Sequence, residues 1–114
     1  MIVEDHSAFA RAFELVLGQV EGTEVALART LEEGRTLLRD GGSFDVVLLD
    51  LTLPDGEGTE LIAEIRQSHP RTPVAVLSAR KDVDEAASKA GADAAIHKDT
   101  PLPDIISSLR RLAG

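Results

Sequence analysis

The run Val46-Val47-Leu48-Leu49-Asp50-Leu51-Thr52-Leu53-Pro54-Asp55-Gly56 decides how the rest of this chain is interpreted. Its first four residues are all apolar, without the alternation expected of a strand with one solvated face. A short continuous apolar run is typical of a strand covered on both faces, as in parallel sheets. The Pro-Asp-Gly that follows indicates a turn beyond the strand.

Four further runs suit buried strands, and helical patterns separate them. The five expected strands are 1–4, 24–28, 46–49, 74–77 and 94–97. Apolar residues at helical spacing, such as Phe9, Phe13 and Leu17, predict a helix after each strand. Strict alternation of five strands and five helices predicts one α/β domain over residues 1–114, with right-handed crossovers and helices on both faces of a parallel sheet.

Several residues mark the ends of these helices. Thr30 with Glu33, and Asp82 with Glu85, have the spacing of a capping box, and Gly91 suits a left-handed helix end. Thr100 before Pro101 predicts the cap of the last helix. We interpret Gly56-Glu57-Gly58 as a flexible loop leading into the third helix, 58–68.

Composition excludes several classes of protein. The 114 residues contain no cysteine, which excludes disulfides and thiolate metal sites. A formal charge of −8 and the absence of Trp and Tyr argue against direct nucleic-acid binding. Without a long apolar run or a leader we expect a cytoplasmic protein with no membrane segment. The first strand starts at residue 1, which leaves open whether residues precede it, and this end should be less stable.

Polar residues follow four of the five expected strands. Glu4 and Asp5 follow the first, Asp50 the third, Ser78 the fourth and Lys98 the fifth. Because ligands of open parallel sheets bind outside the carboxyl ends of the strands, these side chains should converge at one edge.

Three converging carboxylates need a cation. Two negative charges about 4 Å apart repel by roughly 4 kcal/mol at an effective dielectric near 20. Hard oxygen ligands favour Mg²⁺ over Zn²⁺, and the three histidines lack ligand spacing. An aspartate beside Mg²⁺, facing an ammonium and a hydroxyl, suits phosphoryl transfer onto its carboxylate. Asp50 would be the nucleophile, Lys98 would neutralise charge and Ser78 would donate a hydrogen bond.

Over its whole length the chain resembles the receiver domains of response regulators. The matching pieces, in order, are Val3-Glu4-Asp5-His6, the run from Val46 to Gly56, Val76-Leu77-Ser78-Ala79, and Gly91-Ala92-Asp93 leading to Lys98. The resemblance implies a flavodoxin-like fold with strand order 2-1-3-4-5. It also implies phosphotransfer to Asp50 from a sensor histidine kinase or phosphotransfer protein.

The same resemblance implies roles for individual residues. Asp5, Asp50 and the Thr52 carbonyl would bind Mg²⁺ directly and Glu4 through water, while the backbone N–H groups of Thr52 and Ala79 would contact the phosphoryl oxygens. Such a domain is a signalling module rather than an enzyme, although it takes part in its own phosphotransfer and autodephosphorylation. Phosphorylation would reshape the face made by the fourth helix, the fifth strand and the fifth helix.

A finer resemblance concerns the output of the domain. Asp5-His6 and Lys98-Asp99 look like the subfamily whose receivers precede a LuxR-type helix-turn-helix. This implies a DNA-binding output domain outside the chain, in keeping with transcription regulation, and a homodimer on phosphorylation.

The sequence departs from the family pattern at two positions. Ala95 stands where a switch Tyr or Phe is usual, so only Ser78 of the usual switch pair is present and coupling should be weaker or routed differently. Asp99 stands where proline is common, which leaves the isomer of the Lys98–Asp99 bond open.

Two other functions remain open at this point. A phosphohydrolase of the haloacid dehalogenase type also uses an aspartyl phosphate and Mg²⁺. That family, however, has a second aspartate two residues after the nucleophile, where this chain has Thr52. A receiver-like interaction module that is never phosphorylated is compatible with Ala95, although every acceptor-site residue is present.

Overall fold

The predicted parallel sheet is present, with the order that the resemblance implied. A computed structural model of the protein describes residues 1–4, 7–18, 26–40 and 42–114. Five parallel strands lie in the order β2-β1-β3-β6-β7, which is 2-1-3-4-5 counted within this sheet. The strands are β1 (Ile2–Val3), β2 (Leu27–Ala28), β3 (Val47–Asp50), β6 (Val74–Ser78) and β7 (Ala94–His97).

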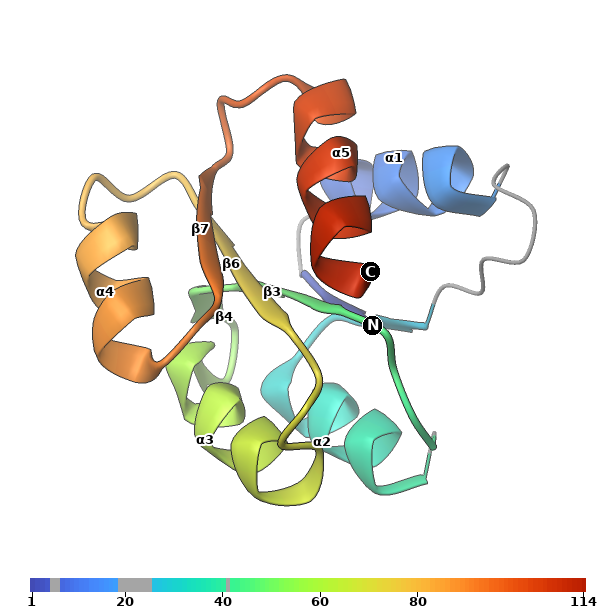
Figure 1. Ribbon diagram of the computed structural model, residues 1–114, viewed down its shortest axis with the longest axis vertical. Coiled ribbons are helices and arrows are strands. Elements are labelled where there is room, and N and C mark those ends of the chain that lie inside the picture. The colour runs from blue at the N-terminus through green and yellow to red at the C-terminus, as the bar shows by residue number, and fades with distance from the viewer. Residues whose placement is uncertain (5–6, 19–25, 41) are drawn as a thin grey trace.

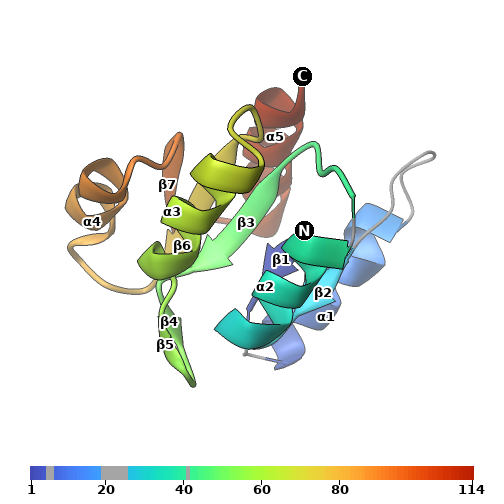
Figure 2. The same ribbon diagram turned by 90° about the horizontal axis from the view of Figure 1, so that it is seen from below.

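Five helices cover the sheet on both sides. They are α1 (Ser7–Gly18), α2 (Leu31–Asp40), α3 (Thr59–Ser68), α4 (Val83–Ala90) and α5 (Leu102–Ala113). Figures 1 and 2 show α1 and α5 together on one face, with α2, α3 and α4 on the other. The α/β prediction is therefore confirmed, although the parts of the first helix and second strand expected at residues 20 and 24–25 lie outside the described residues.

Successive side chains of the strands enter two separate hydrophobic clusters in alternation. Val47, Leu49 and Val76 pack with α2, α3 and α4, whereas Leu48 and Leu77 pack with α1 and α5. All five are at most 2% exposed. The continuous apolar run thus has the predicted cause, because successive side chains of a doubly covered strand enter different cores.

The helix ends agree only partly with the predictions. The Thr30–Glu33 box forms, with Glu33 N–H donating to Thr30 Oγ1 (3.0 Å), and Gly91 ends α4 in the left-handed conformation (φ 85°). The prediction of an Asp82–Glu85 capping box is wrong. Asp82 accepts hydrogen bonds from the Arg80 guanidinium and makes no cap bond. Thr100 is not the α5 cap either. Pro101 takes that position without a side-chain bond.

The segment after β3 is a small hairpin, where we had expected a flexible loop. β4 (Thr52–Leu53) pairs antiparallel with β5 (Gly56–Glu57), and Gly58 then returns to the end of β3. Gly58 N–H donates to the Leu51 carbonyl (2.6 Å), and a side chain at Gly58 would collide with the Asp50 carbonyl oxygen. The glycine is required by close backbone approach, not by flexibility.

At the end of the sheet remote from Asp50, one guanidinium joins three segments. Arg66 of α3 donates to the carbonyls of Thr72 and Gly91 (2.9 Å each) and to the Asp93 carboxylate (2.8 Å). The same carboxylate accepts the Val74 N–H (2.7 Å). Arg66 therefore ties α3 to the start of β6 and to the α4–β7 turn.

We predict that Gly58→Ala lowers the free energy of unfolding by about 1–3 kcal/mol, because the added methyl group must displace the Asp50 carbonyl. Gly34→Ala is the matched control. There the new Cβ would lie 2.9 Å from Leu61 Cδ2, the end of a side chain, and at ordinary contact distance from Val3. Because alanine also favours the helix that contains Gly34, the change should stay within about 1 kcal/mol. Urea unfolding followed by far-UV circular dichroism measures both variants. Equal free energies of unfolding for Gly58→Ala and Gly34→Ala would contradict the prediction.

Candidate functional site

Three of the predicted site residues meet at the carboxyl ends of their strands. Glu4 follows β1 directly, Asp50 ends β3 and Lys98 follows β7. The Lys98 ammonium donates to Glu4 Oε1 (2.8 Å) and to Asp50 Oδ2 (3.1 Å). Parallel pairing of β1 with β3, and of β3 through β6 with β7, places the three side chains side by side.

Both carboxylates are buried, which makes the shared ammonium important. Glu4 is 1% and Asp50 5% exposed. Burial, followed by the nearby Asp50, raises the pKa of Glu4 to about 7 despite the opposing effect of Lys98. Burial alone would lower the pKa of Lys98, but its hydrogen bonds to Glu4 and Asp50 outweigh this and raise it. Deprotonation of Glu4 would therefore leave the site with more negative charge than one ammonium compensates.

Among the described contacts, the side chains of Ser78, Thr52 and Ala79 make no hydrogen bond with Glu4 or Asp50. Ser78 is the last residue of β6 and buried, and its Oγ accepts the Arg80 N–H (3.0 Å). The backbone N–H of Thr52 donates to Asp50 Oδ1 (3.3 Å). Ala79 is exposed in the loop after β6. Asp5 lies outside the described residues.

The two departures from the family pattern have clear structural consequences. Ala95 is half-buried on the β7 face that packs with α4, against the first hydrophobic cluster. Position 95, where the family usually has an aromatic switch residue, therefore carries only a methyl group. The Lys98–Asp99 peptide bond is trans, as are all peptide bonds of the described residues.

Sequence reasoning missed two residues around the site. The ring of Phe9, expected only in the core, lies 5.6 Å from the Lys98 ammonium, within reach of a cation–π contact. Arg80 joins the β6–α4 loop to the hairpin through Glu57 (3.0 Å) and also pairs with Asp82 (2.8 Å). Arg80 lies two residues after Ser78, which is the only signal that could have pointed to it.

The donor set of the site fits a hard cation. Glu4 Oε2 is buried and makes no hydrogen bond within the part of the chain that the structure describes, so one oxygen of this carboxyl group is left unsatisfied beside Asp50. A buried carboxyl oxygen without a partner is costly, and a divalent ion or its water would satisfy it once Glu4 is ionised. Within the described ranges no three acidic, histidine or cysteine side chains gather as metal ligands.

Comparison with known proteins decides the family. The family model described as "Response regulator receiver domain" matches residues 1–110. The chain belongs to this family. Among curated relatives, the receiver is 40% identical over 94 residues to the response regulator protein PilR of Pseudomonas aeruginosa, covering 81% of this chain and 21% of PilR. It spans only about half or less of the length of the curated relatives it matches.

Solved structures agree with the family assignment. The CheY-like receiver domain protein of Methanospirillum hungatei has a TM-score of 0.88 and 29% identity, covering 98% of this chain and 90% of that one. A response regulator from Burkholderia pseudomallei has a TM-score of 0.84 and 25% identity, covering 98% and 66%. Its structure is described as holding a phosphorylated aspartic acid, a calcium ion and citrate.

These findings establish a receiver domain of a two-component response regulator, a signalling domain rather than a classical enzyme. They decide against the phosphohydrolase alternative. Membership of the LuxR-type subfamily stays a prediction. Among the described helices, none is long and apolar enough to cross a membrane.

The raised pKa of Glu4 predicts how stability depends on pH in the metal-free protein. The folded state holds a proton on Glu4 up to about pH 7, whereas the unfolded chain releases it near 4.5. The folded form therefore binds more protons in this window, and stability falls as pH rises through it. Relative to Glu4→Gln, the wild-type protein should lose about 2–3 kcal/mol between pH 4.5 and 7. Urea unfolding at a series of pH values measures this, and parallel curves would show that Glu4 does not titrate there.

Proposed function

We propose that this receiver accepts a phosphoryl group on Asp50 from a histidine kinase or phosphotransfer protein, in a reaction that requires Mg²⁺. The observation that carries the proposal is the contact of one ammonium, that of Lys98, with both Glu4 and Asp50 at the shared strand edge. The aspartyl phosphate described for the Burkholderia pseudomallei regulator supports the same chemistry.

Glu4, Asp5, Asp50 and the Thr52 carbonyl would hold the Mg²⁺. When bound, the ion neutralises charge on the phosphoryl oxygens. The unpartnered Glu4 Oε2 supports this assignment. The calcium ion in the Burkholderia pseudomallei structure is also a hard cation of the kind that oxygen ligands prefer.

The remaining side chains of the site each have a separate role in the transfer. An Asp50 carboxylate oxygen bonds to phosphorus as the bond between phosphorus and the donor's leaving atom breaks. Lys98, already beside that carboxylate, neutralises the incoming negative charge. The Thr52 N–H, which now donates to Asp50, would turn to a phosphoryl oxygen together with the Ala79 N–H and the Ser78 hydroxyl. Later hydrolysis of the acyl phosphate returns the domain to its starting state.

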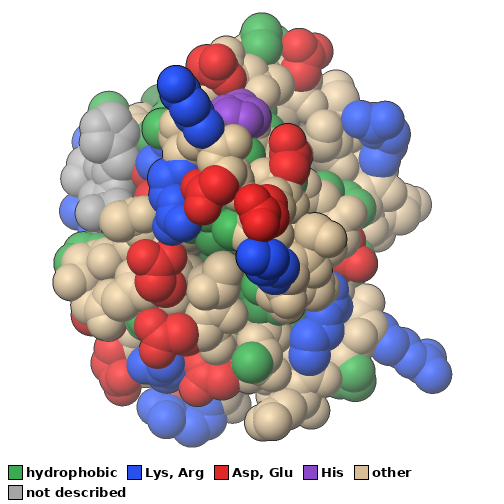
Figure 3. All heavy atoms as spheres, turned by 90° about the vertical axis from the view of Figure 1, so that its left-hand side faces the viewer, with side chains coloured by type: hydrophobic (Ala, Val, Ile, Leu, Met, Phe, Trp, Pro, Cys, Tyr) green, Lys and Arg blue, Asp and Glu red, His purple; other side chains and the backbone are tan. Residues whose placement is uncertain are grey.

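The switch face would be α4, β7 and α5, and Ser78 would start the change. Its hydroxyl accepts the Arg80 N–H, so a movement of Ser78 toward the phosphoryl group would carry the β6–α4 loop with it. With Ala95 in β7, no aromatic ring follows this movement, so we infer that the loop itself carries the change. Figure 3 shows acidic and basic side chains interspersed on the α4 side of the molecule. Such a mixed surface suits a protein partner or a second copy.

We predict that acetyl phosphate with Mg²⁺ adds one phosphoryl group to the protein, and that Asp50→Asn abolishes the addition. Asp99→Asn is the control, because Asp99 is an exposed carboxylate beside Lys98 and should leave the addition unchanged. Intact-protein mass spectrometry with and without EDTA makes the measurement. No mass gain in the wild type would reject the proposal in favour of an unphosphorylated interaction module, and an undiminished gain in Asp50→Asn would reject Asp50 as the acceptor.

A further inference from the structure

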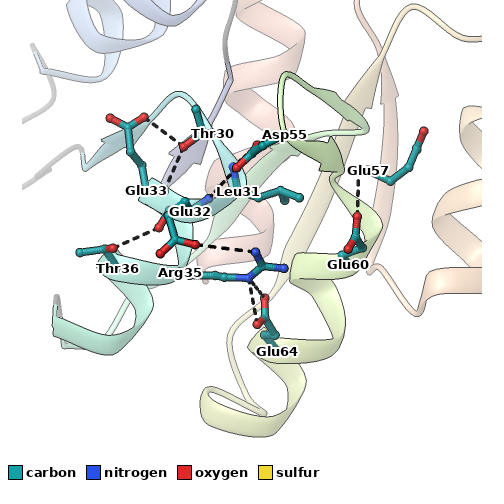
Figure 4. A network of polar contacts seen from close by, with 10 residues as sticks. All are labelled: Thr30, Leu31, Glu32, Glu33, Arg35, Thr36, Asp55, Glu57, Glu60 and Glu64. Atoms are coloured by element: carbon teal, nitrogen blue, oxygen red, sulfur yellow. Dashed lines mark hydrogen bonds and ion pairs between the residues drawn. The ribbon is translucent and has the colours of Figure 1, made fainter.

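The tip of the β4–β5 hairpin is bound to the start of a helix far away in sequence. Asp55, in the turn of the hairpin, accepts the Leu31 N–H on Oδ1 (2.8 Å) and the Glu32 N–H on Oδ2 (3.1 Å). Figure 4 shows its carboxylate directed at the first turn of α2. These two N–H groups have no partner inside a helix, so a carboxylate from another element completes the cap.

The cap of α2 is therefore shared between two independent contributors. Thr30 Oγ1 serves the Glu33 N–H within the local capping box. Asp55 serves the two preceding N–H groups from 23 and 24 residues away. Hydrogen bonding to the Leu31 N–H holds the pKa of Asp55 below its usual range, so the contact persists as a charged one at neutral pH.

Contacts with the rest of the domain fix the geometry of the hairpin, because its own strand pairing is too short to do so. Each of its strands has two residues, and isolated two-stranded hairpins are at best marginally stable. Leu53 packs into the core, and Gly56 lies so close to Leu31 that a Cβ there would be 2.8 Å from the leucine Cδ1. The tip thus approaches α2 through its backbone, with Asp55 making the polar contact.

The base of the same hairpin belongs to the phosphoacceptor site. Thr52 is two residues after Asp50, pairs with Glu57 across the hairpin, and donates its N–H to the Asp50 carboxylate. The direction of both Thr52 backbone groups therefore follows the orientation of the hairpin. Glu57 is tied in turn to Arg80 on the opposite side.

We propose that Asp55 is a positioning residue for the Mg²⁺ and phosphoryl site, acting through the start of α2 on the backbone of Thr52. This deepens the function proposed above and rests on it for the ligands. By fixing the tip of the hairpin against α2, Asp55 holds the Thr52 carbonyl toward the metal position and the Thr52 N–H toward Asp50.

The test compares Asp55→Ala and Asp55→Asn with two matched controls in the 114-residue chain. Thr30→Ala removes a cap contact from the same helix end without touching the hairpin. Glu32→Gln removes the same charge from an exposed side chain there. Two-dimensional NMR follows a titration with MgCl₂ alone, and hydrogen exchange of the Thr52 amide is recorded without metal.

Asp55→Ala should weaken Mg²⁺ binding about threefold to tenfold and speed exchange of the Thr52 amide by a similar factor, as expected for losing one capping interaction. Asp55→Asn should lie between it and the wild type, and both controls should stay within about twofold. Thermal unfolding is measured alongside, and Thr30→Ala should lower the Tm about as much as Asp55→Ala.

Two results would overturn the inference: exchange at Thr52 that is equal in Asp55→Ala and Thr30→Ala, or a loss of Mg²⁺ affinity in Glu32→Gln as large as in Asp55→Ala. Failure of the proposed function would be recognised separately, as a wild-type protein that takes up no phosphate. In that case the exchange rate of the Thr52 amide would still measure whether Asp55 positions the hairpin.

Discussion

Two buried carboxylates share one ammonium, and the rest of the structure is arranged around this contact. Glu4, Asp50 and Lys98 come from three strands that are distant in sequence, and parallel pairing delivers them to a common edge. Helices on both sides exclude water from the strands, which strengthens the attraction and raises the cost of any unpaired charge. Lys98 therefore pairs with both carboxyl groups, yet one oxygen of Glu4 makes no hydrogen bond among the described residues, which favours a cation.

Features set by local pattern or by strand ends could be predicted from the sequence. The run from Val46 to Leu49 is apolar because its side chains enter two cores, and the polar residues after the strands converge because parallel strands share an edge. The Thr30–Glu33 box was predicted because both partners lie within one turn. The Asp82–Glu85 box was wrong because a nearby guanidinium, that of Arg80, competes for the Asp82 carboxylate.

Contacts between segments that are distant in sequence could not be predicted, because no local pattern indicates them. Asp55 caps a helix that starts 24 residues earlier, and no spacing rule connects the two. The β4 and β5 strands are two residues each, too short to show a periodicity of two. Phe9 has the helical spacing of a core residue, and only the folded structure shows that its ring also faces the Lys98 ammonium.

Arg66 has a consequence for how the domain can move. Its guanidinium joins α3, the entrance of β6 and the α4–β7 turn at the end of the sheet opposite to Ser78. Since both the strand before α4 and the turn after it are anchored there, a shift of the β6–α4 loop cannot carry the helix away as a whole. We expect α4 to tilt instead, with its C-terminal end as the pivot and the largest displacement at its N-terminal end.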